Sequence, residues 1–186
     1  YASCFKNGGK GIAQNYPYWD AKAQKVKTFE AELNECRTKN GEKPLKWKKG
    51  DIASISAYMG STSNGKKISI KVPSDAGAQA AYERGKNHFY AKRGQLNLSC
   101  ANCPKDNAGN RIRGDILSTA LGHPSHFPVH RLRWNGIGTM HRRFGGCNKQ
   151  VRAKPFKAQS DEYAALEYFL NYMSNGIEVN APSSRK

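Results

Sequence analysis

Apolar residues recur at helical spacing in the first part of the chain. The first predicted helix has four apolar side chains on one face: Val26, Phe29, Leu33 and Cys36. This spacing places Cys36 on a buried face. A shorter apolar stripe at 52–59 predicts a second helix, and an alanine-rich stretch with aromatic residues at 76–93 predicts a third.

The last predicted helix has signals at both ends. Ser160 is a good N-cap, and the acidic residues at 161–162 suit the positive end of the helix dipole. Apolar residues between 166 and 173 form one stripe, and Gly176 ends the helix. Together the periodic segments predict a mainly α fold.

Two stretches lack helical periodicity. Residues 61–75 are rich in Ser, Lys and Gly and predict a linker, with a short extended piece at 68–72. Residues 97–159 are dense in Gly, Pro, His and Arg and predict a long loop region. A structureless stretch of that length in a compact domain indicates a site or a cofactor that organises it.

Two segments of the chain match in order and spacing. Six residues separate Cys36 from KPLK at 43–46, and six separate Cys147 from KPFK at 154–157. An acidic helix start and then a Tyr-Met and Ser-Asn-Gly phrase follow in both segments. This agreement indicates an internal duplication.

The duplication predicts two domains joined by the linker. Repeat one lies near 1–66 and repeat two near 74–186, so the boundary gives domains 1–72 and 73–186. Domains of this size have thin cores and benefit from a covalent staple.

The charge balance adds an expectation about partners. The net charge is +17, which indicates anionic partners such as nucleic acid, anionic lipid, an acidic protein or small oxyanions. The basic residues are dispersed along the chain, with one dense arginine group: Arg131, Arg133, Arg142, Arg143 and Arg152. No nucleic-acid-binding motif is recognisable. No apolar run approaches the roughly 20 residues that span a membrane.

The cysteines carry the candidate chemistry. Five is an odd number, and in an oxidising compartment it predicts pairs plus one thiol left for chemistry. Cys100 and Cys103 form a Cys-x-x-Cys motif, for which four interpretations are open. The first is attachment of a c-type haem, although Pro104 stands where a His should follow. The second is a redox dithiol, which needs a βαβ setting, and the third is a zinc site shared with Cys147 and a His. The fourth is a local disulfide or a pair of buried thiols.

Cys147 follows the segment HRRFGG at 141–146. Thiolates are the nucleophiles and metal ligands, and nearby cations favour them. Arg142 and Arg143 supply such a field and can hold an oxyanion through bidentate hydrogen bonds. The paired glycines allow close approach of a ligand or a partner chain. We therefore expect Cys147 to be the reactive cysteine.

Three histidines lie close together in the loop region, at His123, His126 and His130. Two or three of them could bind a metal. Loop histidines more commonly pack against aromatic or polar neighbours, and we favour that role for these three.

Six segments carry a family resemblance: 93–95, 98–103, 108–118, 122–134, 140–153 and 162–176. In residue order and motif they resemble the SoxA family of bacterial thiosulfate-oxidation proteins. The resemblance covers nearly the whole chain and is dense over the second repeat.

The resemblance implies two cytochrome-c-like repeats. In single-haem members the first repeat is degenerate and haem-free and keeps a disulfide, a role that Cys4 and Cys36 fit. The second repeat carries one haem c, attached through Cys100 and Cys103, with Cys147 as an iron ligand that is often a persulfide in the family. The family is periplasmic.

One position departs from the family pattern. The family has His where this chain has Pro104, and proline has no ring nitrogen that could ligate iron. Three consequences are open: haem is held by two thioethers with Cys147 and some other ligand; haem is absent and Cys100 pairs with Cys103; or the proline is not the natural residue. We expect the haem to be retained, because its loss would leave the long loop region without an organising core.

The resemblance implies an enzyme, an L-cysteine S-thiosulfotransferase. Such an enzyme joins thiosulfate oxidatively to a cysteine of a SoxY-like carrier (SoxYZ) and passes two electrons to a SoxX-like c-type cytochrome, its heterodimer partner. Cys147 and Arg143 are then catalytic, with Arg142 or Arg113 assisting at the sulfonate oxygens. The alternative is a haem-free, degenerate homologue that acts as a binding or scaffold module of the Sox complex.

Overall fold

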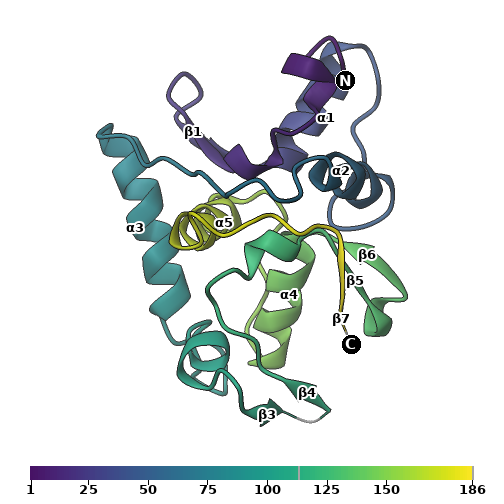
Figure 1. Cartoon of the computed structure of the whole chain (residues 1–186). Coiled ribbons are helices and arrows are strands. Elements are labelled where there is room, and N and C mark those ends of the chain that lie inside the picture. Colours follow the sequence, from purple (N-terminus) through teal and green to yellow (C-terminus); the bar gives the residue numbers. More distant parts are fainter. Residues whose placement is uncertain (113, 186) are drawn as a thin grey trace.

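The first half of the chain folds into a hairpin followed by two helices (Figure 1). In the computed structural model, which describes residues 1–112 and 114–185, β1 (Tyr18–Asp20) pairs antiparallel with β2 (Lys25–Lys27). Helices α1 (Phe29–Lys39) and α2 (Asp51–Ser61) follow and pack against each other.

The second half is built on three helices: α3 (Ala76–Tyr90), α4 (Met140–Gln150) and α5 (Asp161–Met173). Among the described elements, the most extensive contact is between α3 and α5. A side chain at Gly85 would collide with the backbone carbonyl of Ala165, so glycine is required at this crossing.

Short strands connect these helices. β3 (Arg111–Ile112) and β4 (Asp115–Ile116) form a hairpin. A three-stranded sheet has the order β6 (Gly136–Gly138), β5 (Val129–Arg131), β7 (Ser183–Arg185), with β5 antiparallel to β6 and parallel to β7. The remaining turns are short 3-10 or π helices at Lys6–Gly9, Ala13–Asn15, Asn102–Asp106, Pro124–His126 and Leu132–Trp134. This sheet brings the C-terminal strand next to the middle of the chain.

Side-chain caps fix the starts of three helices. Thr28 accepts a hydrogen bond from the Ala31 amide at the start of α1, and Asp75 caps α3 in the same way. Ser160 caps α5, as its sequence predicts. Each cap satisfies one of the amide groups that the first turn of a helix leaves without a partner.

The prediction of a mainly α fold is only partly right, because the described chain is a mixture of helices and short strands. The larger error is at 97–159, which was predicted to be a loop region but contains α4 and the strands β3 to β6. The pair Gly145–Gly146 lowers the helix propensity of α4. Tertiary packing of one apolar face outweighs that cost.

Three clusters of buried side chains hold the molecule together. One lies in the first half, around Phe29, Leu33 and Ile52. A second lies in the second half, around Phe89 and Tyr163. The third draws on both halves: Ile68, Ile70, Ala81, Tyr168, Val179 and Ala181.

The predicted linker is part of this shared cluster. Ile68 and Ile70 are buried, and the Ile68 amide donates a hydrogen bond to the carbonyl of Ile177. The segment is extended where 68–72 predicts it, but it packs against the C-terminal segment instead of joining two separate bodies. The apolar alternation of Ile68 and Ile70 is the signal for this burial.

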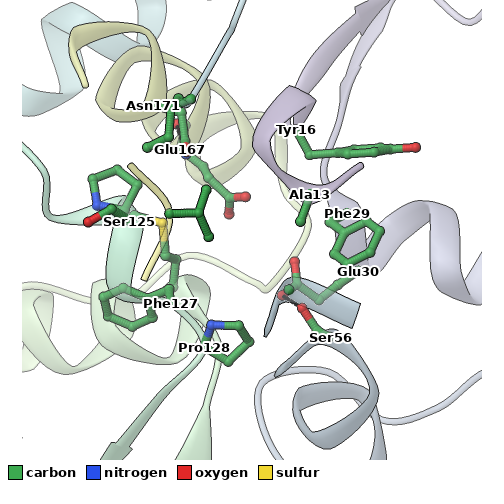
Figure 2. Close-up of a pocket in the computed structure, with 15 residues that line it drawn as sticks. Ala13, Tyr16, Phe29, Glu30, Ser56, Ser125, Phe127, Pro128, Glu167 and Asn171 are labelled. Atoms are coloured by element: carbon green, nitrogen blue, oxygen red, sulfur yellow. Dashed lines mark hydrogen bonds between the residues drawn. The ribbon is translucent and has the colours of Figure 1, made fainter. Parts of the chain in front are cut away.

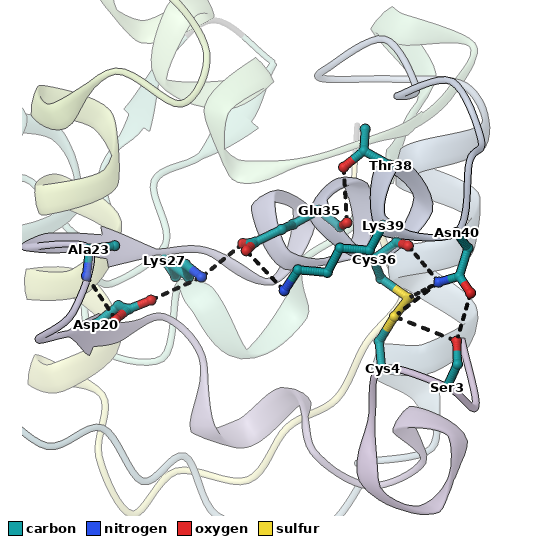
Figure 3. A network of polar contacts seen from close by, with 10 residues as sticks. All are labelled: Ser3, Cys4, Asp20, Ala23, Lys27, Glu35, Cys36, Thr38, Lys39 and Asn40. Carbon is teal, nitrogen blue, oxygen red and sulfur yellow. Dashed lines mark hydrogen bonds and ion pairs between the residues drawn. A yellow bond between two sulfur atoms is a disulfide. The ribbon is translucent and has the colours of Figure 1, made fainter.

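Covalent and ionic contacts tie α1 to the N-terminal segment (Figure 3). A disulfide joins Cys4 to Cys36, with 5.7 Å between their Cα atoms. Lys27 contacts Asp20 at 2.9 Å and Glu35 at 2.8 Å, which connects the β1–β2 hairpin to α1. No helix in the described part of the chain is both long and apolar enough to cross a membrane.

Candidate active site

A cavity of about 500 Å³ lies in the second half of the molecule. Its walls come from the C-terminal end of α3, from α4 and α5, and from the segments that precede β3 and β5. Most of the lining is apolar, and its cysteine and ionisable side chains are Cys100, Cys103, Cys147, Arg93, Arg131, Arg133, Arg143, Arg185, His88, His123, Asp115 and Tyr163. A cavity of this volume with a few polar groups is typical of ligand and cofactor sites.

One face of α4 forms a wall of this cavity. Met140, Arg143, Phe144 and Cys147 all line it. Their spacing places them on one side of a helix, one turn apart. Arg143 therefore lies directly one turn before Cys147, so that an anion could contact both side chains.

Three sulfur atoms face the cavity. Cys100, Cys103 and Cys147 are all unpaired and partly buried. Burial, and then the charge of the neighbouring Cys147, raise the pKa of the Cys100 thiol to about 11. Burial and Cys147 also raise the pKa of Cys103, while Arg143 acts in the opposite direction. Cys147 is thus close enough to both motif cysteines to affect their ionisation.

Cys147 meets the two conditions that its predicted role requires. It is not bridged to another cysteine, and it shares a cavity with Arg143. Its thiolate character stays a prediction.

Three of the five arginines that line the cavity lie close enough to influence one another's charge. Arg131 belongs to β5, Arg143 to α4 and Arg185 to β7. Burial and then the charge of Arg143 lower the pKa values of Arg131 and Arg185. Asp115 faces Arg131 at 3.7 Å, and Ser118 accepts a hydrogen bond from Arg185 at 2.8 Å. Because the three cations repel one another, a bound anion would relieve an unfavourable charge arrangement.

Sequence reasoning missed one of these arginines altogether. Arg185 reaches the cavity only because β7 pairs with β5 across a separation in sequence that no local motif marks. The sequence indicates Arg131 only as a member of the dense arginine group and not as a residue of the site. A parallel pairing of two short strands leaves no periodic signal in the sequence.

Arg142 and Arg113 are the two arginines expected to assist at the sulfonate oxygens. Arg142 does not line the cavity: its guanidinium lies over the Trp134 ring, 4.4 Å from the centroid, and it donates to the Ile137 carbonyl. The prediction that Arg142 holds an oxyanion together with Arg143 therefore has no support in this arrangement. Arg113 lies outside the described residues.

Of the three loop histidines, His123 lines the cavity. Burial, and then the positive charges of nearby arginines led by Arg185, lower the pKa of His123 to about 3. Its ring is therefore neutral at physiological pH. Within residues 1–112 and 114–185, no group of three or more His, Cys, Asp or Glu side chains could hold a metal ion by themselves.

Pro104 lies in the π-helical turn that contains Cys103, and it lines the cavity as well. Its carbonyl accepts a hydrogen bond from the Ala120 amide at 2.7 Å. The residue is therefore fixed at the edge of the cavity, where its ring offers carbon atoms and no metal ligand.

Comparison with solved structures places this architecture among known proteins. The crystal structure of SoxXA from P. pantotrophus superimposes with a TM-score of 0.89 and 34% sequence identity, over 100% of this chain and 70% of that chain. The chain belongs to the SoxA family.

SoxA sequences from several bacteria agree with this assignment. The L-cysteine S-thiosulfotransferase subunit SoxA of Chlorobaculum tepidum is 55% identical over 100% of this chain, and that of Allochromatium vinosum is 50% identical, also over 100%. The chain spans 64% and 66% of the lengths of these two relatives. The family model for the SoxA/TsdA cytochrome c domain matches residues 1–68.

Proposed function

We propose that this SoxA-family chain is an L-cysteine S-thiosulfotransferase that joins thiosulfate to a cysteine of a carrier protein. The observation that carries the proposal is the shared cavity of Cys147 and Arg143, with Arg131 and Arg185 beside them. A nucleophilic sulfur next to a cluster of guanidinium groups suits a substrate that combines a reactive sulfur with a sulfonate. The names of the SoxA relatives point to the same activity.

The first step loads Cys147. The thiolate forms an S–S bond with the sulfane sulfur of thiosulfate, and two electrons leave, giving Cys–S–S–SO₃⁻. Arg143 holds the sulfonate oxygens and stabilises their charge as the bond forms. The two electrons pass to a SoxX-like c-type cytochrome, which is the oxidant.

The second step transfers the group. A thiolate of the SoxYZ-like carrier attacks the sulfane sulfur, the bond to Cys147 breaks, and Cys147 leaves as a thiolate. The product is carrier–S–S–SO₃⁻, with atoms and charge balanced. The partly exposed helix surface at Gly146, where a Cβ atom would meet no neighbour within 4 Å, leaves room for an approaching carrier segment.

The residues around the cavity fit a haem c in part. Cys100 and Cys103 are unpaired thiols on one turn that could form thioether bonds to a haem, and Cys147 lines the same cavity and could ligate its iron. When bound, the haem would supply an acceptor for the electrons of the first step. Pro104 has no ring nitrogen that could ligate the iron, so this chain departs from the family pattern.

Matched helix pairs support the two-repeat description. Helices α1 and α4 are each 11 residues long, follow a threonine N-cap position, and carry Cys36 and Cys147 at equivalent positions. A KPLK or KPFK loop then leads to α2 or α5. We therefore keep domains 1–72 and 73–186 as two cytochrome-c-like repeats, the first haem-free and closed by the disulfide of Cys4 and Cys36. A periplasmic location would maintain this disulfide.

The activity can be tested with the chain, a SoxX-type cytochrome, a SoxYZ-type carrier and thiosulfate. We expect Cys147→Ala to abolish the mass increase of the carrier and to leave the circular dichroism spectrum intact. Lys149→Ala, an exposed position on the same helix, is the matched control. Unchanged carrier loading by Cys147→Ala would refute the proposal.

Pro104 keeps the scaffold alternative open, and a visible spectrum with an intact mass decides it. The enzyme requires a covalent haem in the chain produced with a cytochrome c maturation system. A haem-free chain that still binds the partner proteins but loads no carrier would establish the scaffold. Pro104→His should shift the haem spectrum towards that of a six-coordinate, low-spin iron.

A further inference from the structure

A second, smaller cavity lies where the two halves of the molecule meet (Figure 2). Its volume is about 60 Å³, enough for a few water molecules. The first half contributes Glu30 from α1 and Ser56 from α2, and α5 contributes Glu167. Met140, the first residue of α4, lines this cavity as well as the large one.

Two carboxylates point into this space from opposite sides, as Figure 2 shows. Glu30 is 8% exposed and Glu167 is 7% exposed. Ser56 donates a hydrogen bond to Glu30 at 2.9 Å. The described residues that line the cavity include no lysine or arginine. Two ionised carboxylates without a cation in a buried space are strongly unfavourable.

His141, the second residue of α4, connects this pair to the helix of the large cavity. The His141 ring is buried, and its Nδ1 accepts a hydrogen bond from the Gln159 amide at 3.0 Å. The proton of the neutral ring is therefore on Nε2, which lies 3.1 Å from Glu167 Oε2. Gln159 in turn accepts a hydrogen bond from Thr28, the N-cap of α1, at 2.8 Å. Contacts thus run from α1 and α5 to the first turn of α4.

We propose that Glu30 and Glu167 share one proton across the small cavity and that this proton positions α4 through His141. The proton site stands on this geometry alone. Its effect on Cys147 and Arg143, which α4 carries, rests on the proposed function.

The proton changes the force between the two halves. With it bound, one carboxyl group can donate to the other, directly or through water, and α1 and α5 keep their places on either side of the cavity. Without it, two negative charges repel across the cavity. The contact of Glu167 with His141 then changes, and the first turn of α4 loses a fixed partner.

The surrounding ionisable groups are consistent with proton uptake. Burial, and then the charge of Glu167, raise the pKa of Glu30 to about 7. The ionisable side chains that face Glu30 from other helices are Glu167 on α5 and His141 on α4. Burial also raises the pKa of Tyr16, which lines the cavity, and keeps its phenol neutral.

Infrared spectroscopy of the full chain tests the shared proton directly. A protonated carboxyl group has a carbonyl stretch distinct from that of a carboxylate. We expect a carboxylic acid band that disappears with a midpoint near pH 7, is lost in Glu30→Gln, and persists in the exposed control Glu178→Gln. In Glu167→Gln the midpoint should fall without the band being lost, because the burial of Glu30 remains after the charge of Glu167 is removed. No acid band above pH 6, a band that survives in Glu30→Gln, or an unchanged midpoint in Glu167→Gln would overturn the proton site.

Hydrogen–deuterium exchange tests the positioning of α4. After correction for intrinsic rates, we expect amides of 140–150 to exchange severalfold faster above the transition than below it, and we expect Glu30→Gln to remove that change. A titrating acid band without any change in α4 exchange would refute the positioning role. Neither measurement uses thiosulfate, so these outcomes are separate from a failure of carrier loading by the Cys147 variant.

Discussion

Replacing Glu30 with Gln should remove a large pH dependence of stability. The pKa of Glu30 is raised from 4.5 to about 7 in the folded chain. Between these values the folded state holds a proton that the unfolded state has released, so stability falls as pH rises. At about 1.4 kcal/mol per pH unit, the loss is about 3 kcal/mol in total. Gln cannot ionise, and its oxygen can still accept the hydrogen bond from Ser56.

Urea unfolding at several values between about pH 5 and pH 8 measures this difference. We expect the free energy of unfolding of the wild-type chain to fall relative to that of Glu30→Gln by about 3 kcal/mol over this range. Glu178→Gln, at an exposed position, should follow the wild type. Parallel pH profiles for Glu30→Gln and Glu178→Gln would refute the reasoning. Should Glu30→Gln not fold, Glu167→Gln should reduce the pH dependence in part, because it removes the charge of Glu167 and leaves Glu30 buried.

Three further outcomes follow from the structure. Arg143→Ala should lower kcat/KM for thiosulfate by roughly 10- to 100-fold, because it removes one charge-assisted hydrogen-bonding group. Arg142→Ala should leave kcat/KM near the wild-type value, and equal effects of the two substitutions in a steady-state assay would contradict the assignment. Cys36→Ser should lower the free energy of unfolding by about 2–4 kcal/mol, measured by urea titration without reductant, and an unchanged value would show that the disulfide adds no stability. Gly85→Ala should cost about 1–3 kcal/mol through its collision with Ala165, and a thermal melt at or above the wild-type midpoint would contradict that packing.

The helices with strong periodicity could be predicted from the sequence. The stripe of 166–173 and the Ser160 cap correspond to α5, and the alanine-rich stretch corresponds to α3. The helix α4 was missed although Met140, Phe144 and Cys147 have helical spacing. The adjacent glycines Gly145 and Gly146 obscured it, because their low helix propensity opposed the periodicity. Met140 and Phe144, on the apolar face of α4, are buried by tertiary contacts with the core around Tyr163.

The candidate site could be predicted only where its members are close in sequence. Arg143 and Cys147 are one helical turn apart, and the Cys-x-x-Cys motif is contiguous. The arrival of Arg185, and the meeting of Glu30 with Glu167, depend on long-range packing. Their residue types are common on protein surfaces, so composition cannot distinguish them before the fold is known.

The two cysteines at equivalent helix positions indicate how a duplicated unit could divide its roles. Cys36 on α1 is 4% exposed and bonded to Cys4, so its sulfur is unavailable for chemistry. Cys147 on α4 is partly exposed, unbonded and one turn from Arg143. The difference lies in the surroundings: α1 has a cysteine of the N-terminal segment against it, whereas α4 borders a cavity that five arginines line. If the two repeats arose by the duplication that we propose, the first repeat would be a support closed by the disulfide. Its buried Glu30 would then help to position α4, the helix of the second repeat that carries Cys147.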